Sequence, residues 1–195
     1  MIVLASASAV RARLLEAAGV AFTAVPPELD EEAVKARMLA AGASPKAIAA
    51  HLAEAKALAA PAGEGDLVIG ADQTLDLDGA LVDKAASLAE ARERLRALRG
   101  RAHTLHAAAV LARGGEILWR GQASPVMTLR DVSDAFLEDY LAAEGESVLS
   151  SVGCYRLESL GAQLFSHIDG DYFAVLGLPL IPLLAALRDA GAIAS

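Results

Sequence analysis

Short apolar runs alternate along the chain with longer segments in which apolar residues recur every three or four positions. The short runs predict strands, and the longer segments predict amphipathic helices with one buried face. The expected strands are residues 1–5, 22–25, 67–71, 103–113, 116–123 and 126–130, with a further strand and turn over 75–81. The expected helices are residues 8–18, 31–40, 44–58, 87–99 and 133–142, with a last helix after Pro179. This alternation, with strands concentrated in the middle of the chain, predicts an α/β fold built on a mixed sheet.

Start and stop signals support these boundaries. Ser8 and Ser133 can each cap the N-terminus of a helix, and Ser44-Pro45 adds a proline suited to the first turn. Gly100 is placed to end the helix before it, because glycine adopts a left-handed backbone without strain. Gly114-Gly115, between two strand-like runs, predicts a hairpin.

Composition indicates a globular protein with an acidic surface. The chain has 195 residues, 55% of them hydrophobic, so we expect residues 1–195 to bury one core and form a single domain. The net charge of −8 disfavours binding to a nucleic-acid backbone, which needs clustered Lys and Arg, but still allows a basic cleft for a small anion. The single cysteine, Cys154, excludes an internal disulfide and a cysteine zinc cluster, and we expect it to be buried.

The sequence shows no pattern typical of export or of membrane insertion. The apolar run near the N-terminus is followed, not preceded, by basic residues, unlike the run of a signal peptide. The longest uncharged run, Tyr172–Leu187, contains Gly177, Pro179 and Pro182 and falls short of the ~20 residues that a membrane-spanning helix needs. We therefore expect a cytoplasmic protein without membrane contact.

The first candidate site is the junction between the expected strand at the N-terminus and the helix that follows. Ser6 and Ser8 lie in this junction, and Arg11 and Arg13 follow at once. A helix N-terminus offers free N–H groups and partial positive charge, so this junction suits a phosphate group. The alternative is an ordinary capped helix with solvated arginines.

Two acidic residues are candidates for metal or water chemistry. Asp72 follows a buried-type strand and a small-residue turn, which places it at an edge of the sheet, where sites of α/β proteins form. There it could hold Mg²⁺ or activate water, with Glu31 as a second carboxylate. The alternatives are a turn or capping role for Asp72 and a helix-start acid for Glu31.

The chain has only four lysines, Lys35, Lys46, Lys56 and Lys84. Lys56 lies on an alanine-rich helix and Lys84 follows a strand and turn, so either could clamp phosphate oxygens or be a solvated surface charge. Glu158 lies in a segment bounded by glycines, which is typical of loops that line a pocket or lie on the surface.

Two further patterns are rejected as sites. Asp76–Leu81 is similar to the Asp-x-Asp-Gly-Thr-Leu motif of haloacid-dehalogenase-like phosphatases, but no apolar run precedes it, and Asp-Gly is an ordinary hairpin turn. His103 and His106 are three positions apart, which on a strand places them on opposite faces and argues against a shared metal ion.

Taken together, these segments resemble the Maf family, also called septum formation inhibitor proteins, over nearly the whole chain. The matching segments are Leu4–Ser8 with Arg11, Pro26–Glu31, Leu52–Ala57, Ile69–Gln73, Lys84, Gly100–Thr104, Gly153, Gly161, Phe165, Ile168, Gly170 and Val175–Leu180. The resemblance implies a curved mixed β-sheet flanked by helices, in two lobes with a central cleft. It also implies an enzyme that hydrolyses nucleoside triphosphates to monophosphate and pyrophosphate with Mg²⁺ or Mn²⁺ as cofactor. A homodimer is among the partners we expect.

The resemblance implies roles for the candidate residues. Asp72 matches the proton acceptor, and we expect it to bind the metal together with Glu31. The polar catalytic set is Asp72, Glu31, Lys56 and Lys84. The residues on the phosphate side are Ser6, Ser8, Arg11 and Arg13. The positions linked to base choice are Val10, Gln73 and Glu158.

The chain departs from the usual family pattern at several of these positions. Ser8–Arg11 is Ser-Ala-Val-Arg where Ser-Pro-Arg-Arg is usual, and Arg13 is the expected partial substitute. Asp83–Ala85 is Asp-Lys-Ala where Gly-Lys-Pro is usual. Gln73 with Glu158 is similar to the branch that acts on 7-methyl-GTP, and a glutamate can accept guanine's N1–H and N2–H₂. That branch often has Trp where this chain has Val10, and valine offers no aromatic face to a cationic base.

The mechanism that follows is metal-assisted attack of water on the α-phosphorus, with Asp72 and Glu31 placing metal and water. Lys56, Lys84 and Arg11 neutralise the phosphate oxygens as pyrophosphate leaves. Two other functions stay open. One is a nucleotide-binding regulator of septation with little turnover. The other is a phosphatase, which would release orthophosphate instead of pyrophosphate.

Overall fold

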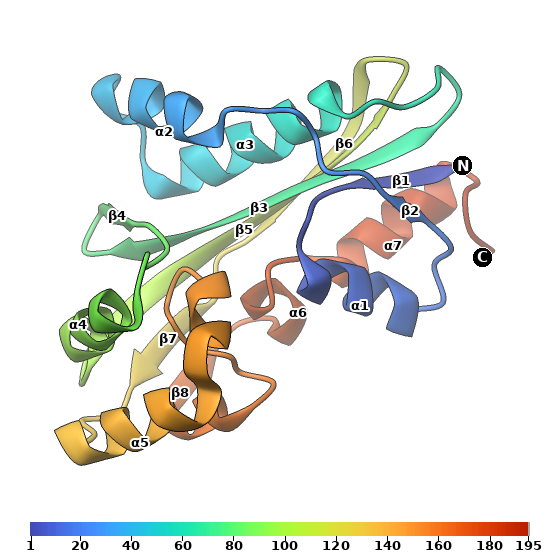
Figure 1. Cartoon of the computed structure of the whole chain (residues 1–195). Coiled ribbons are helices and arrows are strands. Elements are labelled where there is room, and N and C mark those ends of the chain that lie inside the picture. The colour runs from blue at the N-terminus through green and yellow to red at the C-terminus, as the bar shows by residue number, and fades with distance from the viewer. Residues whose placement is uncertain (195) are drawn as a thin grey trace.

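The computed structural model describes residues 1–194, which fold around one eight-stranded sheet (Figure 1). The strands are β1 (Ile2–Ala5), β2 (Thr23–Ala24), β3 (Leu67–Leu77), β4 (Ala80–Val82), β5 (Ala102–Arg113), β6 (Glu116–Ala123), β7 (Val126–Leu129) and β8 (Phe165–Asp169). Neighbouring strands follow the order β2-β1-β3-β5-β7-β8, while β4 pairs with β3 and β6 with β5. β2, β1 and β3 are parallel and the other pairings are antiparallel, so the predicted α/β fold with a mixed sheet is confirmed.

The helices are α1 (Ala9–Ala17), α2 (Glu31–Ala40), α3 (Pro45–Ala59), α4 (Leu88–Leu98), α5 (Asp134–Glu144), α6 (Tyr172–Val175) and α7 (Leu180–Asp189), with 3₁₀ helices η1 (Gly145–Ser150) and η2 (Leu160–Leu164). The six helices expected from the sequence, α1–α5 and α7, begin close to where it predicts. Ser8, Ser44 and Ser133 cap α1, α3 and α5, and each hydroxyl oxygen accepts a hydrogen bond from the N–H three residues later. Gly100, with φ of 68°, follows the end of α4 as predicted.

The side chains of β3 alternate between the two faces of the sheet. Ile69 and Ala71 pack with α1 and α7, whereas Val68 and Gly70 face α3. Because the side-chain period of a strand is two, Asp72 also points to the α3 face. Figure 1 shows the same division, with α2 and α3 on one side of β3 and β5 and with α1, α6 and α7 on the other.

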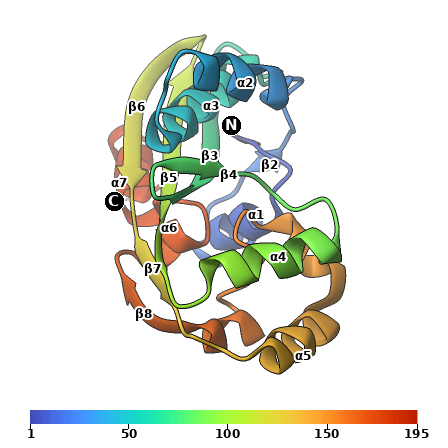
Figure 2. The same ribbon diagram turned by 90° about the vertical axis from the view of Figure 1, so that its left-hand side faces the viewer.

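A separate apolar cluster lies beyond this part of the sheet. It packs α4 and α5 around Leu105 of β5 and Met127 and Leu129 of β7. In Figure 2, α4 and α5 lie together at one end of the molecule, away from α2 and α3. One continuous sheet thus carries two groups of helices. α1, α2, α3, α6 and α7 cover the faces of β3 and β5, and α4 and α5 form the second group.

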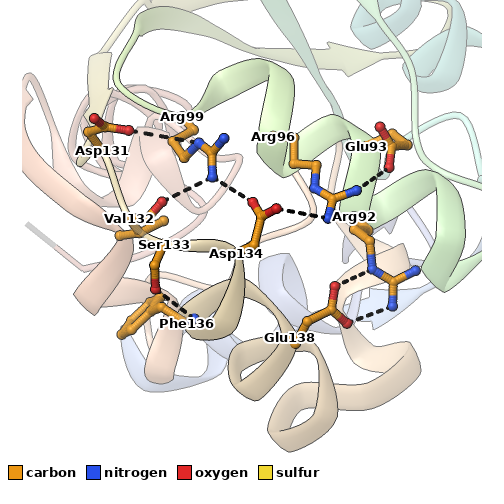
Figure 3. Close-up of polar contacts among 10 residues, drawn as sticks. All are labelled: Arg92, Glu93, Arg96, Arg99, Asp131, Val132, Ser133, Asp134, Phe136 and Glu138. Carbon is orange, nitrogen blue, oxygen red and sulfur yellow. Dashed lines mark hydrogen bonds and ion pairs between the residues drawn. The ribbon is translucent and has the colours of Figure 1, made fainter.

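Ion pairs join the outer surfaces of α4 and α5 (Figure 3). Asp134, in the first turn of α5, receives Nη1 of Arg99 at 2.6 Å and Nη2 of Arg96 at 3.2 Å. Nη2 of Arg92 donates to Glu138 at 2.7 Å. Arg92 and Arg96 of α4 and its C-cap residue Arg99 thereby bind two carboxylates of α5.

The interpretation of residues 67–72 was wrong in one respect. A strand was expected to end at Ala71, with Asp72 after a turn, but β3 continues to Leu77 and Asp72 lies in its middle. β1 stops pairing with β3 at Gly70, while β5 pairs with β3 as far as Asp76. The ladder to β5 therefore keeps the strand extended where its parallel neighbour has ended, so Asp72 lies beside an open edge left by β1.

The Asp-Gly motif forms the turn between β3 and β4, as expected. Asp78 and Gly79 have φ values of 54° and 84°, the left-handed pair that a tight hairpin requires. The 3₁₀ helices, α6 and β8 were not predicted, because none of them carries a clear apolar period. Within residues 1–194, no helix combines the length and apolar character needed to cross a membrane.

Candidate active site

A pocket of about 890 Å³ lies between the α2/α3 side of the sheet and the segment that follows α5. Its walls come from the N-terminus of α1, from α2 and α3, from β3, from the loop after β4, and from residues 147–158. Every site residue named from the sequence lines it. These residues are Ser6, Ser8, Val10, Arg11, Arg13, Glu31, Lys56, Asp72, Gln73, Lys84 and Glu158.

Lys56 lines this pocket and lies between two carboxylates. Its Nζ atom is 2.6 Å from Oδ1 of Asp72 and 2.8 Å from Oε2 of Glu31. The Lys56 and Asp72 side chains are 8% and 10% exposed, whereas Glu31 is 44% exposed. The structure therefore brings together three residues from α2, α3 and β3 that the sequence named separately.

Close packing of α3 on β3 makes this contact possible. A Cβ atom on Gly70 would lie 2.1 Å from the carbonyl oxygen of Ala53 and 2.7 Å from the backbone nitrogen of Ala57, so no side chain fits there. Glycine lets the helix backbone rest directly on the strand. Lys56, on the same face of α3, then lies above Asp72.

Arg11 is buried and its guanidinium is held by the protein itself. Nε donates to the carbonyl oxygen of Gly177 at 2.9 Å, and Nη1 donates to the carbonyl oxygen of Ala71 at 3.0 Å and to Oγ of Ser6 at 3.3 Å. Burial lowers the pKa of Arg11, while the charges of Asp72 and Glu31 act in the opposite direction. Arg11 thus fixes the start of α1 against β3 and adds a positive charge near Asp72.

The serines of this junction order the backbone that leads into α1. Oγ of Ser6 accepts the N–H of Ser8 at 3.1 Å, and Oγ of Ser8 caps the helix at the N–H of Arg11. The N-terminus of α1 consequently forms a wall of the pocket in a defined conformation, and the dipole of α1 favours negative charge at that wall.

Gln73 and Glu158, two of the positions linked to base choice, also line the pocket. The side-chain amide of Gln73 donates to the carbonyl oxygens of Ala174 and Val175 at 2.9 and 3.0 Å, which leaves Oε1 as its free acceptor. Glu158 is 24% exposed, and its Oε1 lies 3.7 Å from Nη2 of Arg13. Arg13 therefore forms an ion pair with Glu158, a residue expected to contact the base.

Lys35 lines the pocket but was not predicted as a site residue. Its Nζ pairs with Glu32 on its own helix and with Oδ1 of Asp83 at 2.7 Å, next to exposed Lys84. Burial would lower the pKa of Lys35, but hydrogen bonds to the two carboxylates outweigh burial and the pKa is raised. Lys35 joins α2 to the loop of Lys84, a contact that no local pattern could predict.

His103 and Tyr155 form a buried pair that sequence reasoning also missed. Nε2 of His103 lies 2.6 Å from the Tyr155 hydroxyl, and Tyr155 reaches the pocket wall. Burial lowers the pKa of His103 to about 4, and its Nδ1 finds no hydrogen-bond partner within residues 1–194. His106, instead, faces Ser124 and Asp76, so the predicted separation of the two histidines is confirmed.

The donor set at Lys56 fits a divalent cation that also binds phosphate. Across the described part of the chain, no three His, Cys, Asp or Glu side chains gather as metal ligands. Asp72 and Glu31 contact Lys56 through one oxygen each, so the second oxygen of each carboxylate can bind a cation. Mg²⁺ is commonly held in this way, by one or two carboxylates together with substrate phosphates.

Comparisons with known proteins agree over nearly the full length. A family model described as Maf-like protein matches residues 1–190. A protein of Caulobacter vibrioides named nucleoside triphosphate pyrophosphatase is 54% identical over 192 residues, covering 98% of this chain and 96% of that protein. A Rhizobium meliloti protein named 7-methyl-GTP pyrophosphatase is 48% identical over 194 residues, covering 99% and 98%. A Brucella abortus protein with the latter name is 45% identical over 188 residues, covering 96% and 94%.

Proposed function

This chain belongs to the Maf family, and we propose that it hydrolyses nucleoside triphosphates to nucleoside monophosphate and pyrophosphate. The observation that carries the proposal is the Glu31–Lys56–Asp72 cluster, which lies in the same pocket as the N-terminus of α1. Carboxylates that can bind a metal ion and a water molecule therefore lie in the same pocket as positive groups that can bind phosphate. The relatives' names, nucleoside triphosphate pyrophosphatase and 7-methyl-GTP pyrophosphatase, support the same reaction.

Asp72 is the proposed proton acceptor. Its carboxylate is nearly buried and fixed by Lys56, so it can hold a water molecule in line with the α-phosphorus and take its proton. Glu31, at the open side of Lys56, helps to place that water. Mg²⁺ or Mn²⁺, held by Asp72 and Glu31, would supply charge neutralisation on the phosphate oxygens.

Four groups are proposed to bind the phosphates. Lys56, on α3, and Lys84, in the loop after β4, both line the pocket. Arg11 contributes fixed positive charge, and Ser6 and Ser8 hold the α1 N-terminus that faces the substrate. Positive groups fixed before substrate arrives stabilise charge that moves to the leaving pyrophosphate.

We propose that Val10, Gln73 and Glu158 contact the base. Oε1 of Gln73 and the carboxylate of Glu158 are acceptors, so they suit the adjacent N1–H and N2–H₂ donors of guanine. The same groups would repel O2 and O4 of uracil and thymine. The preferred substrate is therefore a guanine nucleotide.

The pocket draws on residues from Ser6 to Gly177, which supports the proposal that residues 1–195 act as one functional domain. We also propose that the protein works in the cytoplasm and as a homodimer. Sedimentation of the purified protein tests the second point, because a monomer at assay concentration would contradict it.

A screen of standard and modified nucleotides with pyrophosphate detection tests the function. We expect pyrophosphate release that requires a divalent cation, and Asp72→Asn should lower kcat by ~100-fold or more while the fold survives. Asp189→Asn, at the end of α7 and outside the pocket, is the control. Release of orthophosphate would support the phosphatase alternative, and tight binding without turnover would support the regulator.

A further inference from the structure

Glu144, the last residue of α5, has a buried side chain that contacts the segment carrying Glu158. Its side chain is 4% exposed. Oε2 accepts from Oγ of Ser147 at 3.2 Å and pairs with Nη1 of Arg156 at 3.2 Å, while Oε1 accepts the N–H of Leu160 at 3.1 Å. One carboxylate thus contacts Ser147, Arg156 and Leu160, three residues spread along the segment that carries Glu158.

Glu144 keeps its negative charge despite its burial. Burial alone would raise the pKa of Glu144, but hydrogen bonds from Ser159, Leu160 and Ser147 and the charge of Arg156 outweigh it, so the pKa is lowered. Arg156 therefore pairs with a carboxylate that is charged at neutral pH. The pair engages Nη1 of Arg156 and leaves its Nε for a second partner.

Arg156 lies between Glu144 and Glu158, the carboxylate proposed above to contact the base. Its Nε lies 3.5 Å from Oε1 of Glu158, and its side chain is 27% exposed. Nη2 of Arg13, on α1, lies 3.7 Å from the same oxygen. Glu158 consequently has one guanidinium on the loop side and another on the helix side, and all three side chains line the pocket.

This arrangement changes what Glu158 can select. Alone, a carboxylate attracts both the N–H donors of guanine and any positive charge on the ring. Two guanidinium groups beside it offset that attraction to positive charge but leave oxygen lone pairs for N–H donors. Val10, which also lines the pocket, has no aromatic face on which a cationic ring could stack.

We propose that Arg156, together with Arg13, is a specificity-determining residue that makes the pocket favour uncharged guanine over guanine made cationic by N7 methylation. This inference rests on the proposed function and narrows its substrate class. Glu144 acts through Arg156 as a positioning residue.

The test compares GTP with 7-methyl-GTP in the wild type and in Arg156→Gln, Arg13→Gln and Arg156→Lys. Both kcat/KM and Kd are measured for each nucleotide, at low and at high salt. Arg120→Gln is a matched control, because Arg120 is 58% exposed, as Arg13 is 57% exposed, and pairs with Glu54 outside the pocket. Denaturant unfolding checks that each variant is folded.

We expect the wild type to prefer GTP. Each Arg→Gln change should lower that preference by about 2- to 5-fold, the effect of one partly exposed charge, and the difference should shrink in 1 M salt. Arg156→Lys and Arg120→Gln should keep the wild-type ratio. A wild type that prefers 7-methyl-GTP, or unchanged ratios in both folded Gln variants, would overturn the inference. If no nucleotide releases pyrophosphate, the proposed function fails, while the ratio of the two Kd values still decides the inference.

Discussion

Gly70 and Ala53 pack backbone against backbone, because a Cβ atom on Gly70 would lie 2.1 Å from the carbonyl oxygen of Ala53. This contact seats α3 directly on β3. Lys56, three positions after Ala53, then reaches Asp72, two positions after Gly70, at 2.6 Å. The geometry of the charged cluster therefore depends on a position that carries no side chain.

Gly70→Ala should damage both stability and activity. The added methyl group has no free space and must push α3 from the sheet, which should lower the free energy of unfolding by about 3 kcal/mol. The same displacement separates Lys56 from Asp72, so pyrophosphate release should fall by at least ~10-fold even where the variant is folded. Urea unfolding and steady-state assays measure the two effects.

Gly65→Ala is the control for this change, because nothing lies within 4 Å of a Cβ at Gly65 and its φ is not left-handed. It should leave stability and activity close to wild type. Equal stability of the Gly70 and Gly65 variants would show that α3 can shift without cost and would contradict the packing argument.

Lys56 and Asp72 should behave as a coupled pair. Lys56→Met leaves the nearly buried Asp72 carboxylate without its cation, so the free energy of unfolding should fall by about 3 kcal/mol. Asp72→Asn in the Lys56→Met background removes the remaining charge. The double variant should therefore be more stable than Lys56→Met alone, although neither should retain activity. Additive losses in the cycle of four proteins would mean that the pair is not coupled.

Local signals were sufficient to predict most of the fold. Ser8, Ser44 and Ser133 each have a hydroxyl that satisfies a free N–H at a helix start, and this chemistry is visible in sequence. Asp78-Gly79 fits its hairpin for the same kind of reason, since both residues need a left-handed backbone. The length of β3 was not predictable, because its continuation past Ala71 depends on pairing with β5, which lies far along the chain.

The sequence predicted which residues line the site more fully than it predicted the contacts between them. The resemblance supplied the residues around Lys56, and all of them line one pocket. Glu144, Lys35 and Arg156 were given no role because each acts through a partner distant in sequence or on another element. An acidic residue at the end of a helix is ordinary in sequence, and only its burial in the structure distinguishes Glu144.

Asp134→Asn should weaken the contact between α4 and α5 in a salt-dependent way. Arg96 and Arg99 both donate to Asp134, and these contacts lower the pKa of its carboxyl group (Figure 3). We expect a small decrease in Tm at low salt that disappears in 1 M NaCl, because exposed charges are screened there over about 3 Å. Calorimetry at both salt concentrations measures it. Asp189→Asn serves as an exposed control on α7, and a loss of Tm that persists in high salt would show that Asp134 acts by packing instead.

His103 should make the folded state sensitive to mild acid. Burial lowers its pKa to about 4, against about 6.5 in the unfolded chain, so between these values the unfolded state binds a proton that the folded state does not. The free energy of unfolding must therefore decrease as pH falls from 6.5 to 4, by about 3 kcal/mol in total, and this contribution is fully present only above pH 6.5.

His103→Gln should remove that part of the pH dependence, because glutamine cannot titrate but can still hydrogen-bond to the Tyr155 hydroxyl. Carboxylates also titrate near pH 4, so the informative quantity is the difference between the two curves of unfolding free energy against pH. That difference should change between pH 6.5 and 4 and be constant above pH 7. His51→Gln, at an exposed position of α3, is the control for replacing a histidine by glutamine. Parallel curves for the wild type and the His103 variant would mean that His103 takes up a proton in the folded state, which its burial against Tyr155 and its unpartnered Nδ1 within residues 1–194 argue against.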